Sequence, residues 1–259
     1  MCKVFAIIAL CFVVVPTTSP KPSTDMRILN GNEAAIGQFP FIVSVTRFSV
    51  HRCGGSILSN RYVLSAAHCV SCMDSTGKFT LEDVKEYSIS AGSNNRLYGA
   101  IIAKVAEFVV HENYFNELHD LSILRLETPL VYSDTIKAIP LDTTEVPVGT
   151  TVTIAGWGRQ STNGLLAKNL QYTTEKVLSR SECYDKINLD SPDIYCLARP
   201  VNNGTCIGDS GGPAILADKL VAVANFVFRN RCGLDYPDGF AKISTHLDWI
   251  RAHSDICIE

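Results

Sequence analysis

Short runs rich in Val, Ile and aromatic residues recur along the whole chain, and turn-forming residues separate them. Short strands at this spacing are typical of β-barrels and β-sandwiches rather than of alternating strands and helices. The clearest helical period is at the end, where Leu247, Ile250 and Ser254 share one face. The chain is therefore expected to be all-β with a C-terminal helix. The strand-like runs are 41–45, 56–58, 87–91, 100–110, 121–126, 151–155 and 219–227.

Composition narrows the class of protein further. The chain has 259 residues, of which 46% are hydrophobic and 19% charged. These values exclude a collagen, a coiled coil and a disordered tail, and they allow one large domain or two small ones with a buried core. The net charge is −3 and the basic residues form no cluster. Nucleic acid is therefore not expected as a partner, because phosphate binding needs clustered Lys and Arg.

The ten cysteines indicate either zinc sites or disulfides formed in an oxidising compartment. The N-terminus favours disulfides, because Lys3 precedes an apolar run over residues 4–15 that ends at Pro16. This layout is typical of a secretory signal peptide, and the run is shorter than the roughly 20 residues that span a bilayer. We expect residues 1–19 to be the signal peptide and the remainder to be secreted, with no membrane anchor. Removal of the signal peptide would take Cys2 and Cys11 with it and leave eight cysteines in the secreted chain.

Three separated motifs contain the residue types of nucleophilic catalysis. They are Leu64-Ser-Ala-Ala-His-Cys69, Asp120-Leu-Ser-Ile-Leu-Arg-Leu126 and Cys206-Ile-Gly-Asp-Ser-Gly-Gly-Pro213. Each alone has a plain structural explanation, such as a turn or a core histidine. Their occurrence together, in the order His, Asp, Ser, favours catalysis.

A serine hydroxyl becomes a good nucleophile only when a base lies within hydrogen-bond reach and a third group orients that base. We assign Ser210 as the nucleophile, His68 as the general base and Asp120 as the carboxylate that orients His68. The glycines beside Ser210 allow a tight turn, in which the amides of Gly208 and Ser210 are expected to bind a developing oxyanion.

These motifs resemble those of the chymotrypsin family of serine endopeptidases, and the likeness runs over about residues 28–256. The family fold implies two six-stranded antiparallel β-barrels, about residues 28–135 and 136–259, with the active site between them. The α/β-hydrolases are a rival family, because residues 208–212 also fit their G-x-S-x-G pattern. Their fold requires a helix after the serine, whereas Pro213 and a strand-like run follow here.

The resemblance also implies activation by cleavage. Residues 20–27 are expected to be a propeptide that another protease removes after Arg27, which frees the amino group of Ile28. In the family this amine enters the protein and pairs with the aspartate before the nucleophile, here Asp209. A buried carboxylate needs such a partner, so Asp209 is interpreted as the activation switch.

The pocket that selects the residue before the cleaved bond departs from that of trypsin-like relatives. Their aspartate six residues before the nucleophile corresponds to Gly204, beside Thr205, so a preference for Lys or Arg is not expected. Val227 replaces a glycine at the pocket mouth and follows Phe226, which favours small or medium aliphatic residues. Residues 226–227 and 236–240 most resemble leukocyte elastase and some broad-specificity arthropod collagenolytic proteases.

Two further residues leave alternatives open. Asp238 aligns with a second pocket position, where it attracts a basic side chain or lies buried behind Val227; the buried arrangement is favoured. Asn225 replaces a serine that contacts the catalytic aspartate in relatives. Either its amide donates to Asp120 instead, or the catalytic rate is lowered although the three catalytic residues are intact.

The resemblance pairs six of the remaining cysteines and leaves Cys72 and Cys257 without a standard partner. The implied disulfides are Cys53–Cys69, Cys183–Cys196 and Cys206–Cys232. A zinc site at His68, Cys69 and Cys72 is the alternative, but the catalytic assignment explains His68 better and no second pair completes a tetrahedron.

No metal or other cofactor is expected. The loop that corresponds to the calcium loop of relatives, residues 91–104, contains no Asp or Glu. A glycosylation sequon at Asn203 aligns with the pocket floor and is expected to be unoccupied. Protein or peptide substrates, the activating protease and protein inhibitors are the expected partners of a monomer. The alternative function is an inactive family member that acts as a binding module.

Overall fold

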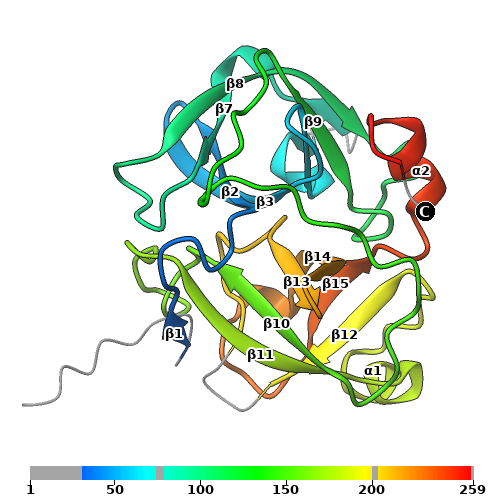
Figure 1. Cartoon of the computed structure of the whole chain (residues 1–259). Helices are drawn as coiled ribbons and strands as arrows, with labels where there is room; N and C mark the ends of the chain where they lie inside the picture. Colours follow the sequence, from blue (N-terminus) through cyan, green and yellow to red (C-terminus); the bar gives the residue numbers. More distant parts are fainter. Residues whose placement is uncertain (1–30, 74–78, 200–203, 258–259) are drawn as a thin grey trace, which may run out of the picture.

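The computed structural model describes residues 31–73, 79–199 and 204–257. The expected signal peptide, propeptide, Arg27, Ile28 and the Asn203 sequon lie outside these residues. Figure 1 shows two β-barrels packed against each other, one from each half of the chain. Both consist of antiparallel strands, and both are closed.

The first barrel has the strand order β2-β3-β4-β9-β8-β7. Alternation of buried and half-exposed residues is plainest in β7, where Tyr87, Ile89 and Ala91 face the core. Because side chains in a strand point to opposite faces in turn, this period-two pattern fixes the register of the barrel wall. Its strands are β2 (Ile42–Arg47), β3 (Val50–Ile57), β4 (Tyr62–Ser65), β7 (Tyr87–Ala91), β8 (Ile101–Val110) and β9 (Ser122–Leu126).

The second barrel has the order β11-β10-β13-β14-β15-β12, and pairing of β12 with β11 closes it. A short strand, β1 (Asn32–Glu33), joins the edge of β11, so the start of the described chain belongs with this barrel although it precedes the first. The strands are β10 (Thr151–Gly156), β11 (Gln171–Val177), β12 (Ile194–Ala198), β13 (Pro213–Leu216), β14 (Lys219–Val227) and β15 (Asp238–Lys242).

Within the described ranges, two α-helices accompany the barrels. α1 (Arg180–Ile187) begins with a capping box between Ser179 and Glu182 and ends at Asn188 in a left-handed conformation. α2 (Leu247–Ala252) returns to the first barrel (Figure 1), where Trp249 and Ile250 join its hydrophobic core. None of the described helices has the length and apolarity needed to cross a membrane. The remaining elements are β5 (Ser71–Met73), β6 (Phe79–Leu81) and the 3-10 helices η2 (Ala67–Cys69), η3 (Val84–Glu86) and η4 (Phe228–Asn230).

The expected fold class is confirmed: the chain forms two closed six-stranded antiparallel barrels and a C-terminal helix. Strands β7 and β14 have the bounds expected from the sequence. α2 is shorter than expected, because it ends at Ala252 and Ser254 follows it, with its hydroxyl donating to the Ile250 carbonyl.

Candidate active site

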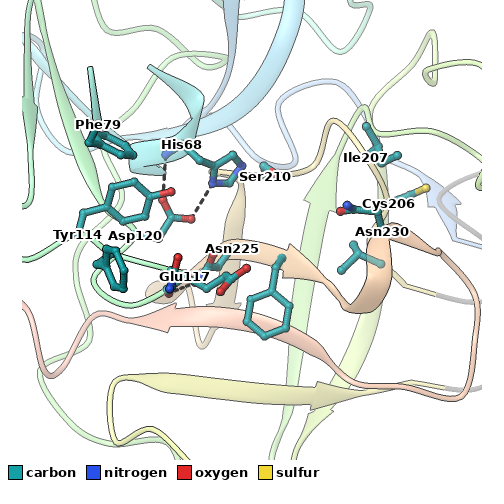
Figure 2. Close-up of a pocket in the computed structure, with 14 residues that line it drawn as sticks. His68, Phe79, Tyr114, Glu117, Asp120, Cys206, Ile207, Ser210, Asn225 and Asn230 are labelled. Carbon is teal, nitrogen blue, oxygen red and sulfur yellow. Dashed lines mark hydrogen bonds and ion pairs between the residues drawn. The ribbon is translucent and has the colours of Figure 1, made fainter. Parts of the chain in front are cut away.

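A cleft of about 320 Å³ is lined by His68, Asp120 and Ser210, which come from three separate parts of the chain. His68 and Asp120 belong to the first barrel half, whereas Ser210 precedes β13 of the second. Figure 2 shows the His68 ring lying between the Asp120 carboxylate and Ser210. The structure therefore brings together the three residues that the sequence motifs single out.

His68 is held by the Asp120 carboxylate through two hydrogen bonds. Asp120 Oδ2 is 2.7 Å from His68 Nδ1, and Asp120 Oδ1 accepts from the His68 backbone amide at 2.9 Å. Burial acts to lower the pKa of His68, but the charge and the hydrogen bond of Asp120 raise it above its ordinary value. Since the carboxylate only accepts, Nδ1 carries the proton and Nε2 is left to act as a base.

Ser210 is positioned by backbone contacts on both sides of the cleft. Its carbonyl accepts from the amide of Gly54 in β3 at 2.8 Å, which ties it to the first barrel. The next amide, of Gly211, donates to the carbonyl of Ala224 in β14 at 2.7 Å. Within the described ranges, no hydrogen bond joins the Ser210 hydroxyl to His68. Catalytic bonds of this kind are often long before substrate binds.

The backbone turn before Ser210 leaves two amides available. Gly208 has φ +101°, a conformation that side chains other than glycine rarely adopt. Its carbonyl lies 2.9 Å from His51 Nε2, so the carbonyl is directed away from the cleft. In the described part of the chain, neither the Gly208 amide nor the Ser210 amide has a hydrogen-bond partner. Two such donors are the components of an oxyanion hole.

Asp209 lies buried behind the nucleophile segment. Its carboxylate accepts from the amides of Gly158 at 2.7 Å and Cys206 at 2.9 Å. Burial raises the pKa of Asp209 to about 7, against the lowering effect of these bonds. Burial therefore disfavours the charged form of this carboxyl group, and a cation beside it would stabilise that form.

The predicted pocket residues separate into a lining and a buried layer beneath it. Thr205, Phe226 and Val227 line a cavity of only about 10 Å³ next to Ser210. A Cβ atom on Gly239 would collide with the Phe226 ring, so this ring fills the space over β15. Gly204 and Asp238 do not line the cavity.

The buried layer is a charged cluster. Asp238 is fully buried and pairs with the guanidinium of Arg199, while the amide and hydroxyl of Thr205 donate to the same carboxylate. Glu175 of β11 is also buried here. Burial, and the nearby Asp238 carboxylate, raise the pKa of Glu175 well above its usual value, against the effect of Arg199. A side chain at Gly204 would collide with Arg199 and Glu175. The sequence motifs did not indicate Arg199 or Glu175.

The side-chain amide of Asn225 donates to a group other than Asp120, the partner considered from the sequence. Its amide donates to the carbonyl of Glu117 at 2.6 Å. The register between β14 and β15 shifts between Ala224 and Phe226, and this bulge directs Asn225 toward the loop that precedes Asp120.

Comparison with known proteins identifies the family. The trypsin family model matches residues 28–250. The chain belongs to the trypsin family. It is a serine protease of that family, and such enzymes hydrolyse peptide bonds.

Several insect proteases are similar to this trypsin-family chain. Serine protease SP24D of Anopheles gambiae is 40% identical over 225 residues, which cover 87% of this chain and 80% of that protein. Trypsin alpha-4 of Lucilia cuprina is 31% identical over 236 residues, or 88% of each chain. The solved structure of neuropsin, described as a serine protease expressed in the limbic system of mouse brain, has a TM-score of 0.76. The matched region covers 86% of this chain and 98% of the neuropsin chain. The two sequences are 24% identical, so this likeness shows the fold alone.

Three disulfides join described residues of the trypsin fold, and they are those that the resemblance implied. Cys53–Cys69 links β3 to η2, which carries His68; Cys206–Cys232 links the nucleophile segment to the loop after η4; Cys183–Cys196 links α1 to β12. Cys72 and Cys257 are free and exposed. Because Cys53 and Cys69 are bonded to each other, they offer no thiolate beside His68 for a metal.

A histidine cluster lies outside the cleft of this trypsin-family chain, and the sequence motifs did not indicate it. His111, His119 and His246 each place a ring nitrogen within 4.8 Å of the others. Burial lowers the pKa of His111 to about 4 and also lowers that of His246. Only the folded arrangement reveals this cluster, since the three residues come from distant segments.

Proposed function

We propose that the chain is a secreted serine endopeptidase, made as a zymogen, that cleaves after small or medium aliphatic residues. The single observation that carries the proposal is the arrangement of His68, Asp120 and Ser210 around one cleft, with the 2.7 Å contact between His68 and Asp120. In this role Ser210 is the nucleophile, His68 the general base and Asp120 the orienting carboxylate.

The chemistry follows the positions of these groups. Ser210 Oγ attacks the carbonyl carbon of the substrate and gives its proton to His68 Nε2, while Asp120 stabilises the imidazolium that forms. The amides of Gly208 and Ser210 donate to the oxyanion, and each such donor is worth about 2.7–4 kcal/mol in the transition state. His68 then protonates the leaving amine. Water, deprotonated by His68, attacks the remaining ester and regenerates Ser210.

Activation is proposed to begin with cleavage after Arg27 by another protease. The new ammonium group of Ile28 would neutralise Asp209, whose burial and raised pKa support the need for a cation. The domain then starts at residue 28, after the signal peptide (1–19) and the propeptide (20–27). The apolar N-terminal run and the three disulfides support secretion.

The preference for aliphatic residues rests on the space and charge of the pocket. A basic substrate side chain requires an accessible carboxylate at the pocket floor. Asp238 is instead buried and bonded to Arg199 and Thr205, and Gly204 has no room for a side chain. Val227, a β-branched residue where relatives have a glycine, lines the pocket with Phe226 and narrows it, so large aromatic residues are disfavoured and the pocket is proposed to be elastase-like.

Covalent labelling tests the role of Ser210. After cleavage at Arg27, a fluorophosphonate probe is expected to form one adduct per chain, and peptide mass spectrometry should locate it on Ser210. The Ser210→Ala variant is the control for probe chemistry elsewhere on the surface. An uncleaved Arg27→Gln chain should label far more slowly, because Asp209 lacks its partner. Absence of an adduct in the cleaved chain would favour the alternative, an inactive homologue that acts as a binding module.

Protein and peptide substrates follow from this function, and protein inhibitors that insert a segment into the cleft are further proposed partners. A monomer suffices, because all three proposed catalytic residues come from one chain.

A further inference from the structure

A buried arginine lies beneath the pocket that selects the residue before the cleaved bond. Arg199 directly follows β12, and only 1% of its side chain is exposed. A Cβ atom on Gly204 would collide with Cδ of Arg199, so the arginine stem fills the space that a side chain at position 204 would need. At this position the resemblance to trypsin-like relatives places their pocket-floor aspartate. An arginine therefore occupies the space in which those relatives have an acid.

Arg199 is paired with an acid that lies directly behind the pocket lining. Asp238 in β15 is the register partner of Val227 in β14, and Val227 lines the pocket together with Thr205. The guanidinium of Arg199 and the hydroxyl and amide of Thr205 all contact one oxygen of the Asp238 carboxylate, Oδ2. The other oxygen, Oδ1, is buried and has no hydrogen-bond partner among the described residues. The carboxylate thus retains an acceptor for a further donor.

The charges beneath the pocket balance without a cation from the substrate. Burial and the nearby Asp238 carboxylate raise the pKa of Glu175 well above its usual value, so the neutral form of Glu175 is favoured. Burial also raises the pKa of Asp238, but Arg199 opposes this effect and favours the charged form. One cation then faces one carboxylate. A second cation beside this pair would be repelled by Arg199 and would lose its own hydration.

We propose that Arg199 is a specificity-determining residue, which pairs with Asp238 as an internal cation and so excludes Lys and Arg from the residue before the cleaved bond. The inference rests on the proposed endopeptidase function and divides its specificity between two residues. Val227 limits the size of the side chain that enters the pocket, whereas Arg199 limits its charge. Without Arg199, the buried Asp238 carboxylate lacks a partner, and a Lys or Arg side chain of the substrate becomes the cation that it needs.

Substitutions at both positions separate the effect of size from that of charge. Val227→Gly alone should admit larger apolar side chains such as Phe, while substrates with Lys remain poor. Adding Arg199→Met should raise the ratio of kcat/KM for a Lys substrate to that for a Phe substrate about tenfold or more, as expected of one hydrogen bond to a charged group. Arg251→Met in the same Val227→Gly background is the matched control. It should leave this ratio unchanged, because Arg251 pairs with Asp248 on the surface.

Asp238→Asn shows whether the gain comes from this carboxylate. In the enzyme with Val227→Gly and Arg199→Met, it should abolish the gain for Lys. In the Val227→Gly enzyme that retains Arg199, it should leave the ratio unchanged, because the paired carboxylate does not attract a substrate cation. This second arm needs no change at Arg199, so it decides the question even where loss of the arginine prevents folding. A fall in the ratio there, or efficient cleavage after Lys by Val227→Gly alone, would overturn the proposal.

Ligand binding tests the role of Arg199 without catalysis. The probe is benzamidine, a flat aromatic cation, and the protein is the full chain carrying Ser210→Ala, cleaved after Arg27. Benzamidine should raise the midpoint of thermal unfolding when Val227→Gly and Arg199→Met are combined, but not with Val227→Gly alone, because a ligand that binds only the folded state stabilises it. A combined variant that unfolds cooperatively, yet neither binds benzamidine nor gains cleavage after Lys, would contradict the role of Arg199. Failure of Ser210 to label with the fluorophosphonate would instead refute the proposed function and leave the binding result standing.

Discussion

Asp120→Asn is expected to lower kcat about 10⁴-fold while leaving the fold intact. Both carboxylate oxygens contact His68, one through the ring nitrogen and one through the backbone amide. An asparagine amide directs a donor at one of these groups, so the His68 ring is held in the wrong tautomer or orientation. Its Nε2 then no longer takes the Ser210 proton. Steady-state hydrolysis of a peptide substrate measures the loss.

The control for this substitution is Asp134→Asn. The Asp134 side chain is fully exposed, and it does not line the cleft. It should leave kcat unchanged. The midpoint of thermal unfolding distinguishes a catalytic loss from a folding defect, and it should be similar in all three proteins. A kcat loss below tenfold in Asp120→Asn would show that His68 does not depend on this carboxylate.

Arg199→Met is expected to destabilise the protein by about 3–5 kcal/mol. The substitution removes the cation that pairs with Asp238 and lies beside Glu175, and both acids are buried under the pocket. Uncompensated buried carboxyl groups must either stay charged at high cost or bind a proton. Urea unfolding at pH 7 measures the change.

A surface arginine provides the matched comparison. Arg251 pairs with Asp248 on the exposed side of α2, and Arg251→Met should not change the midpoint measurably. Adding Asp238→Asn to Arg199→Met should recover part of the loss, because one of the unpaired charges is then absent. Equal effects of the two arginine substitutions would contradict the role given to the buried cluster.

Much of the fold was predictable because the strands have strong local signals. In 87–91, Tyr87, Ile89 and Ala91 alternate with serines, and this pattern survives folding as β7. Two features were not predicted. The pairing of β1 with β11 is a long-range contact that no local pattern encodes. α1 is short, but the Ser179-x-x-Glu182 capping pattern was a readable signal for its start.

In the candidate site, too, some residues could be predicted from the sequence and others could not. His68, Asp120 and Ser210 lie in motifs whose residue types and order indicate their chemistry, so the sequence was enough to select them. Arg199 and Glu175 lie in no such motif, and their importance comes from burial beside Asp238. The histidine cluster was not predicted either, because 127 positions separate His119 from His246 in the sequence. Contacts of this kind exist only once the barrels and α2 have packed.

Cleavage of a randomised peptide library by the chain, after cleavage at Arg27, is the most direct test of the account. Cuts should follow small and medium aliphatic residues, and Ser210→Ala should abolish them. Dominant cleavage after Lys or Arg, or hydrolysis that does not depend on Ser210, would contradict it.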